Sequence, residues 1–343
     1  MQSATDSAES AAPTVDLSLP LLQALNDEHN EAIQECITAK SVKAWIDNQV
    51  KVEQLVKSKL KLRPMPTTVT CLVFASACND VSVVRSLVEA GADVSVTDSC
   101  GNTPLLLSVT KFEENDGDLE KIEYLLQCDA SVVNVGDHGD RTPLHEAALK
   151  KTADLTNVLI QHGADVHASD NDKDTPLHLA TQQGSTDAIS ALIQHGSDVH
   201  SLDLFGRTPL FNACFEGHVN IIHQLIRYGA DVHARDSEME ATPLHIAAYK
   251  NQPDCVKALI EHGAAINATD SRGWTPLHSP AGLGHFATVK VLTSFPECDV
   301  RKKNNAGETA ADLARKKGHD DIAKFLEKKR YGKEYFTVSD VSG

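Results

Sequence analysis

The chain has 343 residues and a formal net charge of −16. The acidic balance is concentrated in residues 64–300, which contain 14 Lys/Arg and 32 Asp/Glu. This balance argues against nucleic-acid binding, which needs a basic surface, and favours a partner with a basic segment. The alternative is that the charge serves solubility alone.

The sequence also predicts a cellular environment. Eight cysteines without a C-x-x-C pair are typical of reduced thiols, and residues 1–18 lack the pattern of a signal peptide. No apolar run reaches the roughly 18 residues of a membrane span, so we expect no membrane insertion. We therefore expect a monomer in the cytosol, with the nucleus as the alternative.

The N-terminal region differs in composition from the rest. Residues 1–17 are rich in Ser, Ala, Thr and Asp, a composition that predicts disorder. Residues 18–66 predict a helical cap that diverges from the repeats that follow it in the chain. Leu19–Ile37 contains a Pro-Leu pair, as the repeats do, followed by a helix-like apolar pattern. A more basic helical segment follows and ends at Pro64.

From there on, one phrase returns at nearly fixed spacing. T-P-L-H occurs at Thr142–His145, Thr175–His178, Thr242–His245 and Thr275–His278. Weaker copies begin at Thr70, Thr103, Thr208 and Thr309. Successive copies begin 33, 39, 33, 33, 34, 33 and 34 residues apart. A second motif in the same phase, G-A-D-V or a variant, begins at Gly91, Gly163, Gly196, Gly229 and Gly263.

A period near 33 residues that carries T-P-L-H-x-A is the signature of the ankyrin repeat, and the chain resembles that family over residues 67–330. Each unit predicts two helices. In the unit 170–203, Thr175 caps the first helix and Pro176 opens it, and Gly184 ends it. The resemblance implies an all-α solenoid of about eight helix-turn-helix units with β-hairpin-like tips, followed by a short tail over 331–343.

Two positions depart from the repeat. The 39-residue interval places extra residues in the unit at Thr103, where Phe112–Glu120 predicts an acidic loop, either a tolerated insertion or a binding loop. Pro280 replaces the usual alanine inside a first helix, which predicts a kinked or shortened helix.

No catalytic or metal constellation is expected. The chain has no G-x-S-x-G, P-loop or H-E-x-x-H motif, so we predict no enzyme activity and no cofactor. The histidines of the T-P-L-H phrases repeat once per unit, and helices pack about 10 Å apart, which is too far for ligands that share one zinc ion. We expect them instead to join each turn to the next unit by hydrogen bonds.

A modification is suggested by the residue that follows D-V. His167, His200, His233 and Asn267 occupy this slot, each with a leucine eight residues earlier. The pattern is similar to that on which the asparaginyl hydroxylase of ankyrin repeats acts. The alternative is that these side chains only bracket the hairpin.

The surface predicted to bind a partner combines the tips with the exposed ends of the first helices. Most tips are polar, and the apolar or aromatic exceptions define the prediction. The residues are Leu204, Phe205, Phe215, Met239, Tyr249, Arg272 and Trp274. The alternative is that the aromatic residues pack locally between tips.

The family resemblance predicts a non-enzymatic adaptor or scaffold that holds another protein in its concave groove. Two other hypotheses stay open, an inhibitor or regulator of a transcription factor and a substrate-recruiting subunit of a larger, ligase-type complex. Fold analogy does not choose among them.

Overall fold

The computed structural model describes residues 50–51, 68–69, 71–78, 81–113, 116–150 and 152–335. The chain divides into two compact units, residues 1–138 and 139–343. The predicted disordered segment 1–17, most of the predicted cap 18–66 and the tail beyond Tyr335 lie outside the described residues.

The first unit contains two helix pairs and a short antiparallel ladder. Its helices are α4 (Cys71–Cys78), α5 (Val81–Glu89), α6 (Pro104–Thr110), α7 (Asp116–Cys128) and the 3₁₀ turn η1 (Ala130–Asn134). The strands β1 (Val50–Lys51) and β2 (Thr68–Val69) pair with each other. At Val50 and Lys51 the chain is therefore extended, and the prediction of a helix is wrong at these two positions.

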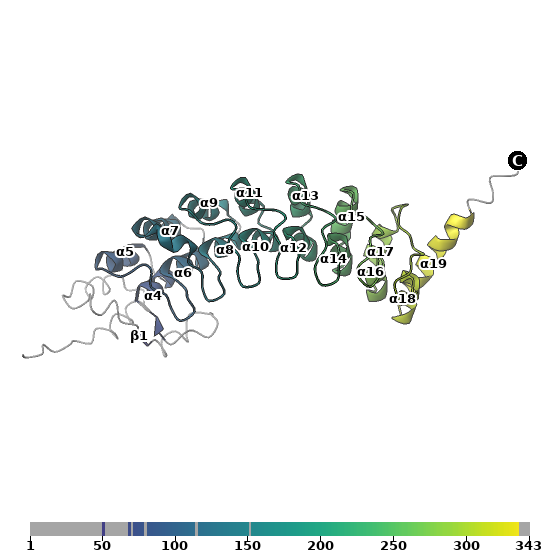
Figure 1. Ribbon diagram of the computed structural model, residues 1–343, viewed down its shortest axis with the longest axis horizontal. Coiled ribbons are helices and arrows are strands. Elements are labelled where there is room, and N and C mark those ends of the chain that lie inside the picture. The colour runs from purple at the N-terminus through teal and green to yellow at the C-terminus, as the bar shows by residue number, and fades with distance from the viewer. Residues whose placement is uncertain are drawn as a thin grey trace, which may run out of the picture. The chain divides into compact units, whose positions relative to one another are not determined.

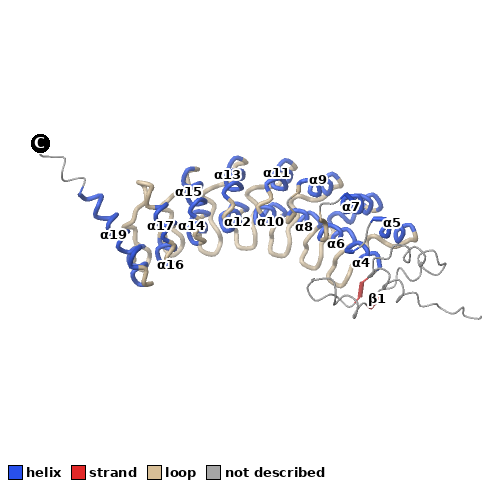
Figure 2. Tube along the Cα trace, turned by 180° about the vertical axis from the view of Figure 1, so that it is seen from behind, coloured by secondary structure: helices blue, strands red, loops and turns tan. Residues whose placement is uncertain are grey.

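The second unit is a run of helix pairs. Its helices are α8 (Pro143–Ala148), α9 (Ala153–Gln161), α10 (Pro176–Gln183), α11 (Thr186–Gln194), α12 (Pro209–Glu216), α13 (Val219–Arg227), α14 (Pro243–Tyr249), α15 (Pro253–Glu261), α16 (His278–Leu283), α17 (Phe286–Leu292), α18 (Ala310–Lys316) and α19 (Asp320–Tyr335). Figure 1 shows α10, α12 and α14 in one row and α11, α13 and α15 in a second. The tips project on the side of the first row that faces away from the second, as Figure 2 shows from behind.

The core of each pair follows from its sequence pattern. In α11 the buried residues Ile189 and Leu192 lie on one face, and Ala180 in α10 is fully buried against the neighbouring helices. The small alanines allow the first helices to approach closely, whereas the longer aliphatic side chains fill the space beneath the second helices. The predicted solenoid of paired helices is confirmed, with eight pairs in the described part of the chain.

Most of the extra residues of the unit at Thr103 lengthen its second helix. α7 begins at Asp116 and has 13 residues, whereas α9, α11, α13 and α15 have nine each. The predicted loop over Phe112–Glu120 is therefore wrong from Asp116 onward. Acidic residues are favourable in the first turn of a helix, and Lys121 pairs with Asp118 at 3.2 Å one turn away.

Pro280 shortens its helix, as the sequence predicts. The first helices of the units at Thr175, Thr208 and Thr242 begin at the proline after the threonine, whereas α16 begins two residues later, at His278. Pro280 then lies in the first turn, where a backbone N–H would have no partner within the helix. The later start lets the chain keep a proline there without losing a helical hydrogen bond.

Buried histidines connect successive units. In the second unit, His178 Nδ1 accepts a hydrogen bond from the Thr175 backbone N–H at 3.2 Å. Its Nε2 donates to the carbonyl of Arg207, in the next tip, at 3.1 Å. Because Nε2 faces a carbonyl oxygen, it must carry the proton, which leaves Nδ1 as the acceptor. His145, His245 and His278 make the same pair of contacts, to Asp174, Trp274 and Glu308. The predicted hydrogen-bonding role is thus confirmed.

A buried carboxylate or amide organises each tip. Asp170 Oδ1 accepts hydrogen bonds from the backbone N–H groups of Asp172 and Asp174, both at 2.9 Å. Asp203, Asp270 and Asn304 make equivalent pairs. These side chains accept hydrogen bonds from backbone N–H groups that would otherwise pair with a neighbouring strand. The described tips are therefore turns, with an isolated β-bridge at Lys303–Thr309.

The histidine contacts predict a dependence of stability on pH. Burial lowers the pKa of His178, His245 and His278 below the usual value, with the backbone hydrogen bond acting in the opposite direction. A lowered native pKa means that the unfolded chain binds protons more tightly, so stability is complete above about pH 6.5 and falls as the pH drops below it.

We expect His178→Leu to lower the urea midpoint at pH 7.5 by the equivalent of about 1–3 kcal/mol, because the Arg207 carbonyl loses its partner. Leu106 and Phe211 occupy the same slot in other units, so an apolar side chain fits there. Below pH 6 the variant should lose stability less steeply than the wild type. Equal slopes in urea denaturation at pH 7.5, 6 and 5 would contradict this.

The carboxyl group of Asp174, in the tip of the unit that begins at Thr175, should change stability with pH in the direction opposite to that of the histidines. Burial, followed by the charges of Asp170 and Asp203, raises its pKa to about 6, and its Oδ1 is buried without a hydrogen-bond partner among the described residues. Because the native pKa exceeds the unfolded value, the native state binds this proton more tightly. This contribution to stability therefore falls as the pH rises from about 4 to 6.

Replacement of Asp174 by Asn should raise the urea midpoint at pH 7.5. Asn102 occupies the equivalent position, directly before Thr103, and its Nδ2 donates a hydrogen bond to Asp98 at 2.9 Å. An equivalent bond to Asp170 would contribute about 1 kcal/mol. The gain should shrink at pH 4.5, and Glu216→Gln, which removes an exposed charge, should leave the midpoint nearly unchanged. A destabilised D174N protein at pH 7.5 would refute the interpretation.

Candidate functional site

Two of the predicted binding residues lie at the tip before α12. Leu204 and Phe205 are 52% and 39% exposed. The Phe205 backbone N–H donates to the buried Asp203 carboxylate at 2.8 Å, which fixes the turn beneath both side chains. The tip therefore presents apolar side chains from a backbone that is already ordered.

Backbone hydrogen bonds connect this tip to the tips on either side. Leu204 N–H donates to the Asp172 carbonyl at 2.8 Å, and Ser237 N–H donates to the Phe205 carbonyl at 2.9 Å. The carbonyls of Met239 and Arg272 accept from the following tips in the same way, at 2.8 and 3.0 Å. We call Leu204, Phe205, Met239 and Arg272 the tip row, because these bonds hold their turns side by side in three consecutive units.

Phe215 and Tyr249 form a second group, at the C-terminal ends of α12 and α14. They are 41% and 52% exposed. Lys250 Nζ lies 3.5 Å from the centroid of the Phe215 ring and 6.0 Å from that of Tyr249, so one ammonium group contacts both rings. These three residues are the helix-end cluster.

Trp274 differs from the other predicted residues because it is only half exposed. The Arg272 guanidinium lies 4.3 Å from its ring centroid and is held in turn by Asp270, with nitrogen and oxygen 2.7 Å apart. The ring also lies 6.1 Å from that of His278. Trp274 thus packs largely within its own unit, which favours the alternative of local packing for this side chain.

A similar stack orders Phe205. Arg207 lies 4.5 Å from its ring centroid, and its guanidinium pairs with the buried Asp203 at 2.8 Å. In both stacks a buried carboxylate orients an arginine, and the arginine orients an aromatic ring. Ordered aromatic side chains lose less conformational entropy when a partner binds.

The tip row and the helix-end cluster are separated by the length of the first helix. Phe205 precedes α12, and Phe215 lies near its C-terminal end, with eight helical residues between the two turns. At 1.5 Å per residue this is roughly 12 Å. The structure therefore arranges the predicted residues as two clusters on the same units.

Three residues that the sequence reasoning missed add to these clusters. Leu202 and Leu283 are exposed apolar side chains, and Lys250 supplies the cation between the rings. The sequence did contain a signal for both leucines. Leu202 stands where other units have the polar residues Ser169 and Thr269, and Leu283 stands where another unit has Gln183. Contact between Lys250 and two rings of different units could not be found without the tertiary structure.

The residues considered for modification have different surroundings. His167, His200 and His233 are exposed. The backbone N–H of each donates a hydrogen bond to the carboxylate of the aspartate two residues earlier. Asn267 is half-buried, donates from Nδ2 to the Glu297 carbonyl at 2.7 Å, and accepts at Oδ1 from the Asp299 N–H at 2.8 Å. Its amide therefore brackets the next turn, and hydroxylation of this set stays a prediction.

Other kinds of site are not formed by the described residues. No group of three or more His, Cys, Asp or Glu side chains in this part of the chain could hold a metal ion. Helices that could cross a membrane are likewise absent from the residues that the structure describes.

A family model supports the repeat architecture. The model for ankyrin repeats, in three copies, matches residues 72–170, 113–203, 147–236, 177–270 and 244–335. Together these matches cover most of the chain, which therefore belongs to the ankyrin-repeat family. Ankyrin repeats are protein–protein interaction modules and are typically without enzyme activity.

Curated proteins match over shorter stretches. The chain is similar to the putative palmitoyltransferase ZDHHC13 of Danio rerio, with 31% identity over 87 residues, 25% of this chain and 13% of that protein. It is also similar to the ankyrin repeat and KH domain-containing protein mask of Drosophila melanogaster, with 34% identity over 97 residues, 28% of this chain and 2% of that protein. The match thus spans a small part of either relative.

The exposure of the helix-end cluster predicts that it contributes little to stability. We expect Phe215→Gln/Tyr249→Gln to change the free energy of unfolding by about 1 kcal/mol or less, since only an exposed cation–π contact is lost. Gln182 occupies the same slot in the preceding unit. Urea denaturation tests this, and a loss of several kcal/mol would show that the rings are packing residues.

Proposed function

We propose that the protein is a non-enzymatic adaptor or scaffold that binds a partner protein through the units beginning at Thr208, Thr242 and Thr275. The observation that carries the proposal is the gathering of exposed apolar side chains in these consecutive units, at the tips and at the ends of the first helices. Such clusters on folded proteins mark interaction surfaces, with aromatic and arginine side chains as the usual anchors.

The order of these side chains supports binding. Asp203 holds Arg207 against Phe205, and Lys250 lies between the two rings of the helix-end cluster. A partner would therefore meet aromatic surfaces whose positions are largely set beforehand. Preorganisation raises affinity by lowering the entropy lost on association.

The charges around the clusters favour a partner with a basic segment. Glu216, Glu238 and Glu240 are exposed beside the tips and helix ends, in a chain with a net charge of −16. Complementary charge steers association and raises its rate. Arg207 and Arg272, by contrast, are paired with buried aspartates and add little free positive charge.

Site-specific photocrosslinking tests the proposal in the full chain. We place p-benzoylphenylalanine at position 215 or 249 in the cell type that expresses the protein and identify adducts by mass spectrometry. The control is the same probe at position 182, which occupies the equivalent exposed slot one unit earlier. We expect one shared adduct from 215 and 249 and none from 182.

The partner is then produced and its affinity measured. Phe215→Gln/Tyr249→Gln should weaken binding by about tenfold or more, as expected for aromatic anchors, while circular dichroism stays unchanged. Binding of a basic partner should also weaken as salt increases. Identical adducts from positions 182 and 215, or full affinity in the folded double variant, would refute the proposal.

A further inference from the structure

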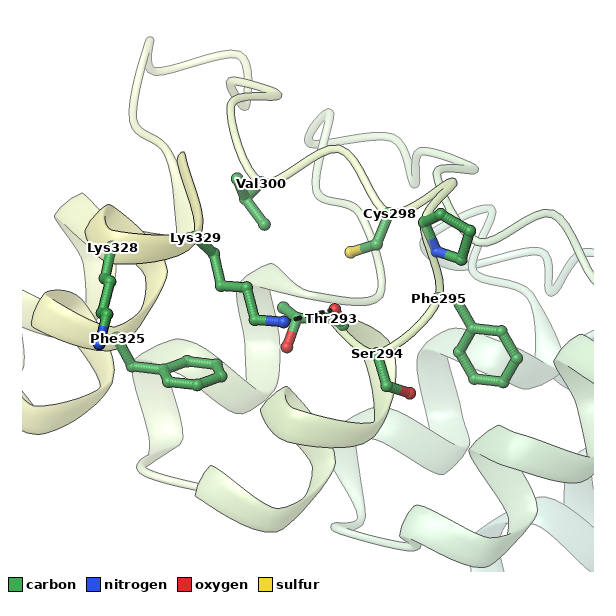
Figure 3. Close-up of a pocket in the computed structure, with 9 residues that line it drawn as sticks. Thr293, Ser294, Phe295, Cys298, Val300, Phe325, Lys328 and Lys329 are labelled. Carbon is green, nitrogen blue, oxygen red and sulfur yellow. Dashed lines mark hydrogen bonds between the residues drawn. The ribbon is translucent and has the colours of Figure 1, made fainter. Parts of the chain in front are cut away.

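A cavity lies between the last two helix pairs, away from the tip row and the helix-end cluster. It has a volume of about 550 Å³ and is bounded by the turn after α17 and by α19. In Figure 3, Phe325 and Lys329 of α19 face Thr293 and Cys298 of the turn across this space. Its volume falls in the range of small-ligand and side-chain pockets.

The sequence explains why the cavity forms in this unit. α17 ends after seven residues at Leu292, and the turn that follows has no G-A-D-V motif but contains Pro296, which cannot continue a helix. Cys298 fills the slot that the buried Ala264 fills one unit earlier. Val300 is half-exposed, whereas its counterpart Ile266 is buried, so the turn covers α19 incompletely.

The cavity is lined by side chains of two kinds. Phe295, Val300 and Phe325 supply apolar walls, and Phe286 packs edge-to-face on Phe325 with centroids 5.2 Å apart. Lys328 and Lys329 also line the cavity, and in Figure 3 the Lys329 side chain reaches into it toward Thr293. An apolar hollow with adjacent cations fits a bulky apolar group next to a negative charge.

These cations are not neutralised by neighbouring carboxylates. Within the described residues neither Lys328 nor Lys329 has an ion pair within 4.0 Å, although Lys329 Nζ donates to the Thr293 carbonyl at 3.4 Å. Residues 301–334 contain eleven Lys/Arg and six Asp/Glu, in contrast to the acidic array before them. The end of the array is thus a local source of positive potential.

The ligand is more consistent with a carboxylate-bearing peptide than with a nucleic acid. Glu297 and Asp299 border a smaller hollow of about 350 Å³ that adjoins the cavity at Cys298, Val300 and Lys329. They would repel a continuous phosphate backbone, which needs an unbroken row of cations. A single carboxylate beside an apolar side chain needs only one or two cations, which Lys328 and Lys329 supply.

We propose that this C-terminal cavity is a second docking site, which binds an acidic segment of a partner protein by inserting one bulky apolar side chain. The inserted side chain contacts Phe295, Val300 and Phe325, and flanking carboxylates pair with Lys328 and Lys329. The site differs in lining residues and in charge preference from the surface of the proposed adaptor function.

Fluorescence anisotropy with defined peptides tests the site on the full chain. The probe is a fluorescein-labelled, end-capped heptapeptide with one central tryptophan flanked by glutamates. The comparison peptides replace the tryptophan by glycine, or all glutamates by lysines. We expect the acidic tryptophan peptide to bind about tenfold tighter than either comparison peptide, because one lacks the apolar side chain and the other lacks the carboxylates.

Matched charge reversals locate the binding. Lys328→Glu/Lys329→Glu should weaken the acidic probe by about tenfold. Lys303→Glu/Lys317→Glu changes the net charge equally in the same final unit, outside the cavity lining, and should leave binding within about twofold. Circular dichroism confirms that both proteins are folded.

A peptide with benzoylphenylalanine in place of tryptophan should form adducts within residues 293–300 or 325–329. The proposal is overturned by no binding of the acidic probe, by equal binding of the lysine peptide, by equal loss in the two double variants, or by adducts elsewhere. Phe215→Gln/Tyr249→Gln should not alter this binding, so failure here is distinguishable from failure of the adaptor function.

Discussion

A hydrogen bond from a buried histidine to the next unit positions the tips that follow His145, His178, His245 and His278. His178 Nε2 reaches the Arg207 carbonyl, at the base of the tip that carries Leu204 and Phe205. An imidazole suits this place because it accepts at one nitrogen and donates at the other, which serves the helix cap and the neighbouring unit together. Since the ring is buried, the loss of either bond would leave a polar group without a partner.

This constraint separates structural from functional side chains. The buried positions of each unit are occupied by groups that hold the array together, such as the histidines and the tip aspartates. Exposed positions include the outer side of the tips and the ends of the first helices. Among the apolar side chains gathered there in three units, Trp274 packs on Arg272, whereas Leu204, Phe215, Met239 and Tyr249 are exposed, as residues of an interface would be.

The two proposed docking sites arise from the repeat in different ways. The tip row and helix-end cluster keep the regular backbone and change only the exposed side chains. The C-terminal cavity instead follows from a change in the backbone, since a short helix and Pro296 leave a hollow beside α19. A repeat array can acquire a binding site by either route, because each unit contacts only its neighbours.

Much of the fold follows from local sequence. The T-P-L-H spacing determined the helix pairs and their starts, because capping threonines, N1 prolines and C-terminal glycines act within one turn of the chain. The shortened helix α16 is one of the two outcomes, a kinked or a shortened helix, that Pro280 predicts. Exposure of Phe215 and Tyr249 also agrees with their slot in the repeat.

Other features depended on contacts between units, which sequence spacing does not encode. α7 begins at Asp116, and an ion pair between Lys121 and Asp118 lies within its first two turns. The packing of Trp274 on Arg272, the contact of Lys250 with the Phe215 ring of another unit and the cavity beside α19 each depend on side-chain positions in three dimensions. The sequence by itself determined which units repeat and where most of the helices begin. Only the tertiary structure decided which exposed side chains meet, because their distances depend on how neighbouring units pack.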